Sequence, residues 1–314
     1  MDVLVTGGAG FIGANLCAAL RADPDIGRIV VLDDLSTGIR ENLEPLKDIE
    51  LVVGSILDTE VLARSAAGIE SIVHLAARPS VPRSLADPVA THNANATGTL
   101  NVLEAARLGS RPHVIVASSS SVYGANPALP KSEDMATMPM SPYGASKLAT
   151  ESYTLAHGRS FAMDVLAFRF FNVFGPLQAA DHAYAAVIPA FIAAALRGEP
   201  VTVHGDGNQT RDFTYVGSVA SVLVDAVNRR VSSDRPVNLA FGSRVSLIEL
   251  IALLEKVTGV QITRNHTDPR PGDVRDSQAD QSRLRQLFPD AVAVSLETGL
   301  DQTVGWFRTP TGPN

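Results

Sequence analysis

The sequence predicts an α/β fold built on a doubly wound parallel sheet, with a smaller α/β lobe attached to it. In the first half of the chain, short apolar segments alternate with segments of helical periodicity, which is the pattern of parallel strands joined by helical crossovers. A glycine-rich turn lies directly between the first of these strands and the first helix. With 314 residues, 45% of them hydrophobic, the chain is long enough to bury a large core.

The expected strands are short runs rich in Val, Ile and Leu, each flanked by glycine or polar residues. They lie at residues 3–6, 28–32, 50–53, 71–75, 113–118 and 164–168. Helices are expected in the intervals, at residues 12–22, 59–66, 89–108 and 143–159. Because crossovers between parallel strands are right-handed, these helices would cover both faces of one sheet.

The pattern changes after Gly175-Pro176 to shorter elements. We expect a helix at 186–197 and a hairpin-like region around Gly205-Asp206-Gly207. Residues 1–170 would form the sheet domain and residues 171–314 mainly the lobe, with later segments threading back onto the sheet.

Composition argues against several classes of function. A net charge of −7 gives no basic face for nucleic acid. No run approaches the roughly 18 apolar residues of a membrane span, and Met1 leads straight into a strand without a leader, so a cytoplasmic protein is expected. The seven histidines lack the spacing of a zinc helix, and we expect no metal.

The glycine turn has the spacing of a dinucleotide-binding site. Gly7, Gly10 and Gly13 would allow a tight turn, a close approach of the backbone to a pyrophosphate, and close packing of helix against strand. The helix N-terminus that follows favours phosphate. Asp33 and Asp34 end the second strand, where a carboxylate would bind ribose hydroxyls and repel a 2′-phosphate. The turn therefore predicts NAD rather than NADP.

A second group of residues predicts redox chemistry at an alcohol carbon. Tyr143 and Lys147 are four residues apart and so share one helix face. A nearby ammonium and a cationic nicotinamide would lower the pKa of the phenol, which could then act as a base. Ser119 ends the preceding strand, where ligands of open α/β sheets collect, and could pass a proton from the reacting oxygen to Tyr143.

Taken together, these motifs resemble the extended short-chain dehydrogenase/reductases, and among them the nucleotide-sugar 4-epimerases. The likeness runs over nearly the whole chain. It rests on the glycine turn and on the segments His74-Leu75-Ala76-Ala77, Asn95-Ala96-Thr97-Gly98-Thr99, Arg169-Phe170-Phe171-Asn172-Val173-Phe174-Gly175-Pro176, Arg211-Asp212-Phe213 and Arg270-Pro271-Gly272-Asp273. A Rossmann-type sheet, a UDP-sugar substrate and a homodimer paired through the helices at 89–108 and 143–159 are what the resemblance implies.

The resemblance also implies a set of NAD-binding residues, which are Gly7, Gly10, Phe11, Ile12, Gly13, Asp33, Asp34, Leu35, Ser36, Thr37, Gly38, Ser55, Ile56, Leu75, Ala76, Ala77, Asn95, Ser118, Tyr143, Lys147 and Phe170. One of them departs from the family. Ser55 stands where the family commonly has an aspartate that contacts the adenine, so weaker retention of NAD is expected.

The substrate-binding residues implied in the same way are Ser80, Ser119, Ser120, Tyr143, Asn172, Val187, Thr202, His204, Arg211, Arg270, Asp273 and Ser277. The arginines suit a diphosphate, which needs charge-assisted and preferably bidentate donors. His204 would place its ring against the uracil.

The expected reaction is a simple inversion at C4. Related dehydratases and decarboxylases usually carry an acidic residue within the segment that here reads Ser119-Ser120-Ser121-Val122-Tyr123-Gly124. Two other functions stay open: a nucleotide-sugar dehydratase or reductase, and a non-catalytic dinucleotide sensor, although sensors usually lose the Tyr, Lys and Ser.

The sugar stays open as well. Segments 80–84, 184–189 and 273–280 resemble the subgroup that acts on N-acetylated UDP-hexosamines. By the same resemblance Ser277 would border the C2 substituent, and because serine is small, both the N-acetylated and the plain hexoses are expected to fit. UDP-glucuronate is the alternative. Enzymes for it often carry an arginine after the Gly-Pro, and here Leu177–Asp181 has no cation, although Arg83 could serve.

Overall fold

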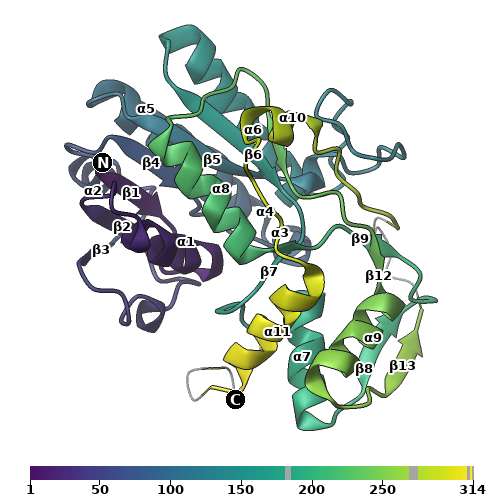
Figure 1. Ribbon diagram of the computed structural model, residues 1–314. Coiled ribbons are helices and arrows are strands. Elements are labelled where there is room, and N and C mark those ends of the chain that lie inside the picture. The colour runs from purple at the N-terminus through teal and green to yellow at the C-terminus, as the bar shows by residue number, and fades with distance from the viewer. Residues whose placement is uncertain (181–184, 269–274, 310–311, 313–314) are drawn as a thin grey trace.

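The computed structural model describes residues 1–180, 185–268, 275–309 and 312. Its centre is a seven-stranded parallel sheet in the order β11-β6-β5-β4-β1-β2-β3, which confirms the predicted fold class (Figure 1). The strands are β1 (Val3–Thr6), β2 (Ile29–Asp33), β3 (Ile49–Val53), β4 (Ser71–His74), β5 (His113–Ser119), β6 (Val165–Phe170) and β11 (Val237–Leu239). Strand order reverses beside β1, the place where open sheets of this type bind ligands.

Helices cover both faces of the sheet. On one face α1 (Phe11–Ala22) packs against α8 (Val216–Asn228), with α10 (Ser282–Leu287) near β11. On the other lie α2 (Thr59–Ser65), α5 (Gly98–Leu108) and α6 (Pro142–Phe161). Segments late in the chain thus return to the sheet: α8 crosses its face and β11 becomes its edge (Figure 1).

The helix expected at 89–108 is helical throughout but has three parts. It consists of α4 (Pro88–His92), a π-helical turn (Asn93–Thr97) and α5, preceded by the short α3 (Val81–Ala86). π-turns are frequent at functional sites, and Asn95 lies in this one. Leu103 in α5 is fully buried in the core beneath the sheet.

The lobe has its own apolar core between α7 (Val187–Arg197), α9 (Leu247–Thr258) and α11 (Leu296–Phe307). The prediction of a hairpin around residues 205–207 is wrong. β8 (Val201–His204) pairs in parallel with β13 (Arg264–Thr267), whereas β9 (Thr210–Arg211) pairs antiparallel with β12 (Val245–Ser246). The turn therefore joins two sheets, and β7 (Val173–Phe174) pairs with β10 (Thr214–Tyr215) in a third.

Candidate active site

Most of the predicted site residues gather at one edge of the sheet, because the carboxyl ends of parallel strands meet there. Gly7–Gly13 follow β1, Asp33–Gly38 end or follow β2, Ser55 and Ile56 follow β3, Leu75–Ala77 follow β4, Ser118–Ser120 end or follow β5, and Phe170 ends β6. Residues more than 160 positions apart in sequence thus lie along this one edge of the sheet, which we call the rim.

The turn after β1 requires its glycines. Gly7 has a φ of +72°, and a Cβ there would lie 2.6 Å from the backbone nitrogen of Ala76 on the loop after β4. A Cβ on Gly13 would collide with the carbonyl oxygen of Gly7. α1 begins at Phe11, and its N-cap Gly10 provides no side-chain cap, so the helix dipole and the N–H groups of the first turn are left for an anion.

Asp33 holds the turn in place. Its carboxylate accepts hydrogen bonds from the backbone nitrogens of Ala9 and Leu35, both at 2.9 Å, and burial raises the pKa of this carboxyl. A Cβ at Gly38 would lie 2.7 Å from its Oδ1, so the loop after β2 passes directly over the carboxylate. Asp34, by contrast, is exposed.

Two further predicted cofactor residues, Asn95 and Ser55, make hydrogen bonds with nearby backbone. Asn95 is buried, and its side-chain amide makes two hydrogen bonds with the backbone of Arg78. Its Oδ1 accepts from the Arg78 nitrogen at 2.7 Å, and its Nδ2 donates to the Arg78 carbonyl oxygen at 3.2 Å. Ser55 accepts a hydrogen bond from the backbone nitrogen of Leu57 at 3.2 Å.

The structure brings Ser119, Tyr143 and Lys147 together. Tyr143 lies in the first turn of α6, where burial raises its pKa and a hydrogen bond involving Ser119 opposes that rise. Lys147, one turn further on, is buried and donates from Nζ to the carbonyl oxygen of Ala117 on β5 at 2.8 Å. Burial lowers the pKa of Lys147 to about 8, so the amine remains mostly protonated at neutral pH.

The hydroxyl of Ser118 is engaged by α6. It donates to Glu151 Oε2 at 3.0 Å and lies 3.4 Å from the carbonyl oxygen of Lys147. Ser120 begins a single 3-10 turn (Ser120–Val122) that is capped by Ser119, whose Oγ accepts from the backbone nitrogen of Ser121 at 3.1 Å.

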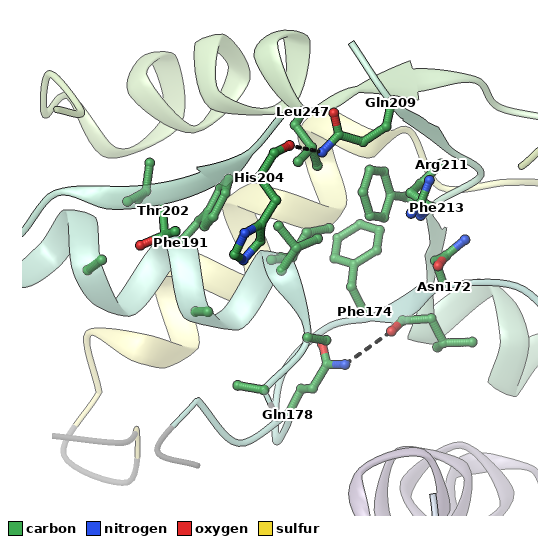
Figure 2. A pocket seen from close by; sticks show the side chains of 18 of the residues that line it. Asn172, Phe174, Gln178, Phe191, Thr202, His204, Gln209, Arg211, Phe213 and Leu247 are labelled. Carbon is green, nitrogen blue, oxygen red and sulfur yellow. Dashed lines mark hydrogen bonds between the residues drawn. The ribbon is translucent and has the colours of Figure 1, made fainter. Parts of the chain in front are cut away.

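A cavity of about 490 Å³ lies in the lobe, between α7, β8 and the β9–β10 segment. Five of the predicted substrate residues line it: Asn172, Val187, Thr202, His204 and Arg211. Figure 2 shows Phe174, Phe191 and Phe213 as its apolar walls. A cavity with apolar walls and a few polar side chains suits a planar base with a charged tail.

The polar side chains of the cavity are held in place by hydrogen bonds to neighbouring residues. Arg211 donates from Nη1 to the carbonyl oxygens of Thr210 at 2.9 Å and Arg275 at 3.1 Å. The Nδ1 atom of His204 lies 2.7 Å from the hydroxyl of Thr267, which fixes the ring orientation. Asn172, at a φ of +26°, donates from Nδ2 to the carbonyl oxygen of Asp212 at 3.1 Å.

Other predicted substrate residues lie outside this cavity. Ser80 caps α3 at a strained φ of +92°. Ser277 donates from its backbone nitrogen to the carbonyl oxygen of Thr210 at 3.1 Å, which holds its segment against the lobe. Arg270 and Asp273 fall outside the described residues.

Gln178 is a cavity residue that the sequence analysis did not assign to the site. Its Nε2 donates to the carbonyl oxygen of Val173 at 3.2 Å, and its buried Oε1 has no hydrogen-bond partner within the described part of the chain. Figure 2 shows this side chain at the cavity beside Phe174. The available signal was a polar side chain close behind Gly175-Pro176, but sequence alone does not tell which polar residue turns inward.

The described residues offer neither a metal site nor a membrane span. Across residues 1–180, 185–268 and 275–309, no three His, Cys, Asp or Glu side chains are grouped so that they could hold a metal ion. None of the helices in that part of the chain is long and apolar enough to cross a membrane.

Known proteins resemble the whole chain. The sequence model described as "NAD dependent epimerase/dehydratase family" matches residues 3–240. A UDP-glucose 4-epimerase of Mycolicibacterium smegmatis is 38% identical over 313 residues, covering 98% of this chain and 99% of that protein.

Two solved structures are similar over the same extent. One is a UDP-N-acetylglucosamine 4-epimerase of Methanobrevibacter ruminantium in complex with UDP-N-acetylmuramic acid, with a TM-score of 0.92 and 36% identity over 98% of this chain and 97% of the other. The other is a UDP-glucuronic acid 4-epimerase of Bacillus cereus with UDP-glucuronic acid and NAD, with a TM-score of 0.88 and 31% identity over 98% of each chain.

Proposed function

Because the chain belongs to the NAD dependent epimerase/dehydratase family, we propose that it inverts C4 of a UDP-sugar through a transient 4-keto sugar. The observation that carries this proposal is the convergence of Ser119, Tyr143 and Lys147 beside the glycine turn. The segment from Ser119 to Gly124 has no carboxylate, so it offers no second acid for the elimination of water.

NAD is the cofactor of this family, and the residues at the rim fit it. The first turn of α1, which no side chain caps, suits the pyrophosphate. Asp33 and Asp34 carry the negative charge that favours an unphosphorylated ribose. NAD held by these residues would supply the hydride acceptor for oxidation at C4 and the hydride donor for reduction of the opposite face of the sugar.

The proton chemistry falls to the chain. Tyr143 takes the proton of the C4 hydroxyl and returns it after the sugar has turned, which requires a phenolate. Burial raises the pKa of Tyr143, and the nearby Lys147 cation opposes that effect by favouring the charged form. Ser119 lies on this proton path: it passes its own hydroxyl proton to Tyr143 as it accepts the proton of the C4 hydroxyl. The buried Lys147 is therefore useful only while it stays protonated.

We further propose that the enzyme acts on both plain and N-acetylated hexoses. The backbone contact of Ser277 with Thr210 supports this proposal, because it holds a small side chain where the resemblance places the C2 substituent. A relative that epimerises UDP-N-acetylglucosamine is 36% identical. UDP-glucuronate is the second candidate, because a uronate epimerase is 31% identical over the same length.

The test is to incubate the purified enzyme with UDP-glucose, UDP-N-acetylglucosamine and UDP-glucuronate and to separate the 4-epimers by chromatography. Ser277→Tyr should abolish turnover of the N-acetylated pair and spare the plain hexoses, because a steric clash excludes the larger group. Ser282→Tyr, an equal change at an exposed position, should leave both activities intact. Wild-type enzyme that rejects N-acetylated sugars, or a Ser277→Tyr variant that keeps both activities, would favour the uronate.

A further inference from the structure

The helix that carries Tyr143 and Lys147 buries a polar face. Its buried residues are Gly144, Ser146, Lys147, Thr150, Glu151, Thr154 and His157. Apolar contacts are non-directional and fix the register of a helix only loosely. The position of α6 along the sheet therefore depends on directional polar contacts.

Glu151 makes the strongest of these contacts. Its carboxylate receives Nε of Arg169 at 2.8 Å and Nη2 at 2.6 Å, a bidentate arrangement, and the hydroxyl of Ser118 at 3.0 Å. Both charged residues are nearly inaccessible, at 4% and 3% relative exposure. Ser118 on β5 and Arg169 on β6 are directly opposite each other in the sheet. One carboxylate thus joins α6 to two adjacent strands.

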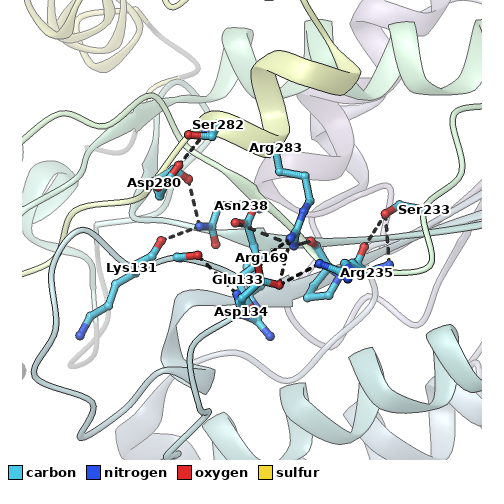
Figure 3. Close-up of polar contacts among 12 residues, drawn as sticks. Lys131, Glu133, Asp134, Arg169, Ser233, Arg235, Asn238, Asp280, Ser282 and Arg283 are labelled. Carbon is cyan, nitrogen blue, oxygen red and sulfur yellow. Dashed lines mark hydrogen bonds and ion pairs between the residues drawn. The ribbon is translucent and has the colours of Figure 1, made fainter.

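Arg169 is in turn held by residues of the segment that follows β5, beside the edge strand β11. Its guanidinium lies over the ring of Tyr123 at 4.7 Å, and its Nη1 donates to the carbonyl oxygen of Glu133 at 3.4 Å. Figure 3 shows Arg169 and Glu133 within a group of polar residues that includes Asn238. Asn238 binds the Tyr123 hydroxyl at 2.6 Å through Oδ1, and its backbone nitrogen donates to Glu133 at 2.8 Å. The arginine therefore has little freedom to move.

We propose that Glu151 and Arg169 are a positioning pair for the epimerisation, which fixes the register of α6 and so holds Tyr143 and Lys147 opposite Ser119. This inference rests on the proposed function. At 1.5 Å per residue, Glu151 lies about 6 Å along the helix from Lys147 and about 12 Å from Tyr143, so a slip at the pair moves both. The two charges cancel, so the pair acts through geometry.

Three variants separate geometry from charge and from stability. Glu151→Gln keeps the shape but unbalances the charge. The double variant Glu151→Met/Arg169→Met removes both charges, a change that buried pairs often tolerate without loss of stability. Glu104→Gln is the matched control, because the Glu104 carboxylate also contacts α6, 3.0 Å from His157 Nε2, but at the other end of the helix.

Turnover is measured per NAD-loaded site with the best UDP-sugar. For the double variant we expect kcat to fall about 10- to 100-fold, since small misplacements of catalytic groups have effects of this size, while KM stays within about threefold because the lobe is untouched. Glu104→Gln should match wild type. A double variant with wild-type kcat would overturn the proposal. So would a double variant that regains the turnover lost in Glu151→Gln, because charge balance or stability would then explain the loss.

Hydrogen exchange of the holoenzymes gives a readout that needs no turnover. In the double variant, the amides of the first two turns of α6 should exchange faster than in wild type. In Glu104→Gln their exchange rates should equal those of wild type. Equal exchange at residues 143–150 in all proteins would contradict the positioning role. If wild type turns over no UDP-sugar, the proposed function fails, while this measurement still decides whether the pair fixes α6.

Discussion

Replacement of Lys147 by methionine should make the protein more stable and inactive. The amine is buried at 5% exposure, and its Nζ donates a hydrogen bond to the carbonyl oxygen of Ala117 at 2.8 Å. No carboxylate contributes to its pKa, which burial alone lowers from 10.5 to about 8. A buried cation paired only with a carbonyl costs free energy of folding, and methionine has a similar length without the charge.

The size of the effect follows from the pKa of Lys147. A fall from 10.5 to about 8 corresponds to about 3 kcal/mol at 1.36 kcal/mol per pKa unit. Loss of the hydrogen bond to Ala117 returns about 1 kcal/mol. At pH 7 the variant should therefore gain about 2 kcal/mol in free energy of unfolding.

The dependence on pH gives the sharper test. The pKa of Lys147 is lower in the folded protein than in the unfolded chain, so the unfolded chain binds more protons between pH 8 and 10.5. The free energy of unfolding of wild type therefore rises with pH across that window. The advantage of Lys147→Met should shrink over the same range. Urea unfolding of both proteins, stripped of cofactor, at pH 7 to 10 measures the difference. A variant less stable than wild type at pH 7, or a difference that does not change with pH, would refute this reasoning.

Three other expectations concern the base, a buried histidine and assembly. Tyr143→Phe should keep the fold and bound NAD while turnover falls about 10²–10⁴-fold, and wild-type turnover would contradict its role as base. Burial lowers the pKa of His113 from 6.5 to about 4, so the unfolded chain binds its proton first. The difference in free energy of unfolding between wild type and His113→Gln, measured in urea, should therefore fall by about 3 kcal/mol from pH 7 to 4. A difference that stays constant would be inconsistent with that pKa shift. We also propose a homodimer through the face of α4 and α6 that exposes Val89 and Tyr153. Light scattering should then give a dimeric mass for wild type and a lower one for Val89→Glu, and a monomeric wild type at micromolar concentration would rule the dimer out.

Much of the fold could be predicted because its signals are local. The strands that end in Thr6 and Asp33 are apolar runs bounded by polar or glycine residues, and a sheet buried on both faces has that pattern wherever it occurs. Because the strands are parallel, their carboxyl ends lie at one edge of the sheet, so the convergence of the glycine turn with Ser119 was also within reach of the sequence.

The lobe shows where such signals end. The turn at Gly205–Gly207 looks like a hairpin because two short polar and apolar runs flank it. In the structure β8 pairs with β13, some 60 residues away, and β9 with β12. Which strands pair is decided by the burial of side chains from distant segments, and this is not encoded in the turn.

Residue type and short spacing are enough to predict the sheet, the cofactor turn and the order of Ser119, Tyr143 and Lys147 along the chain. The lining of the cavity by Gln178, the hydrogen bond from Ser118 to Glu151 and the ion pair of Glu151 with Arg169 can be read only from the packed structure. These contacts join residues from separate elements, and their geometry is set by how those elements pack.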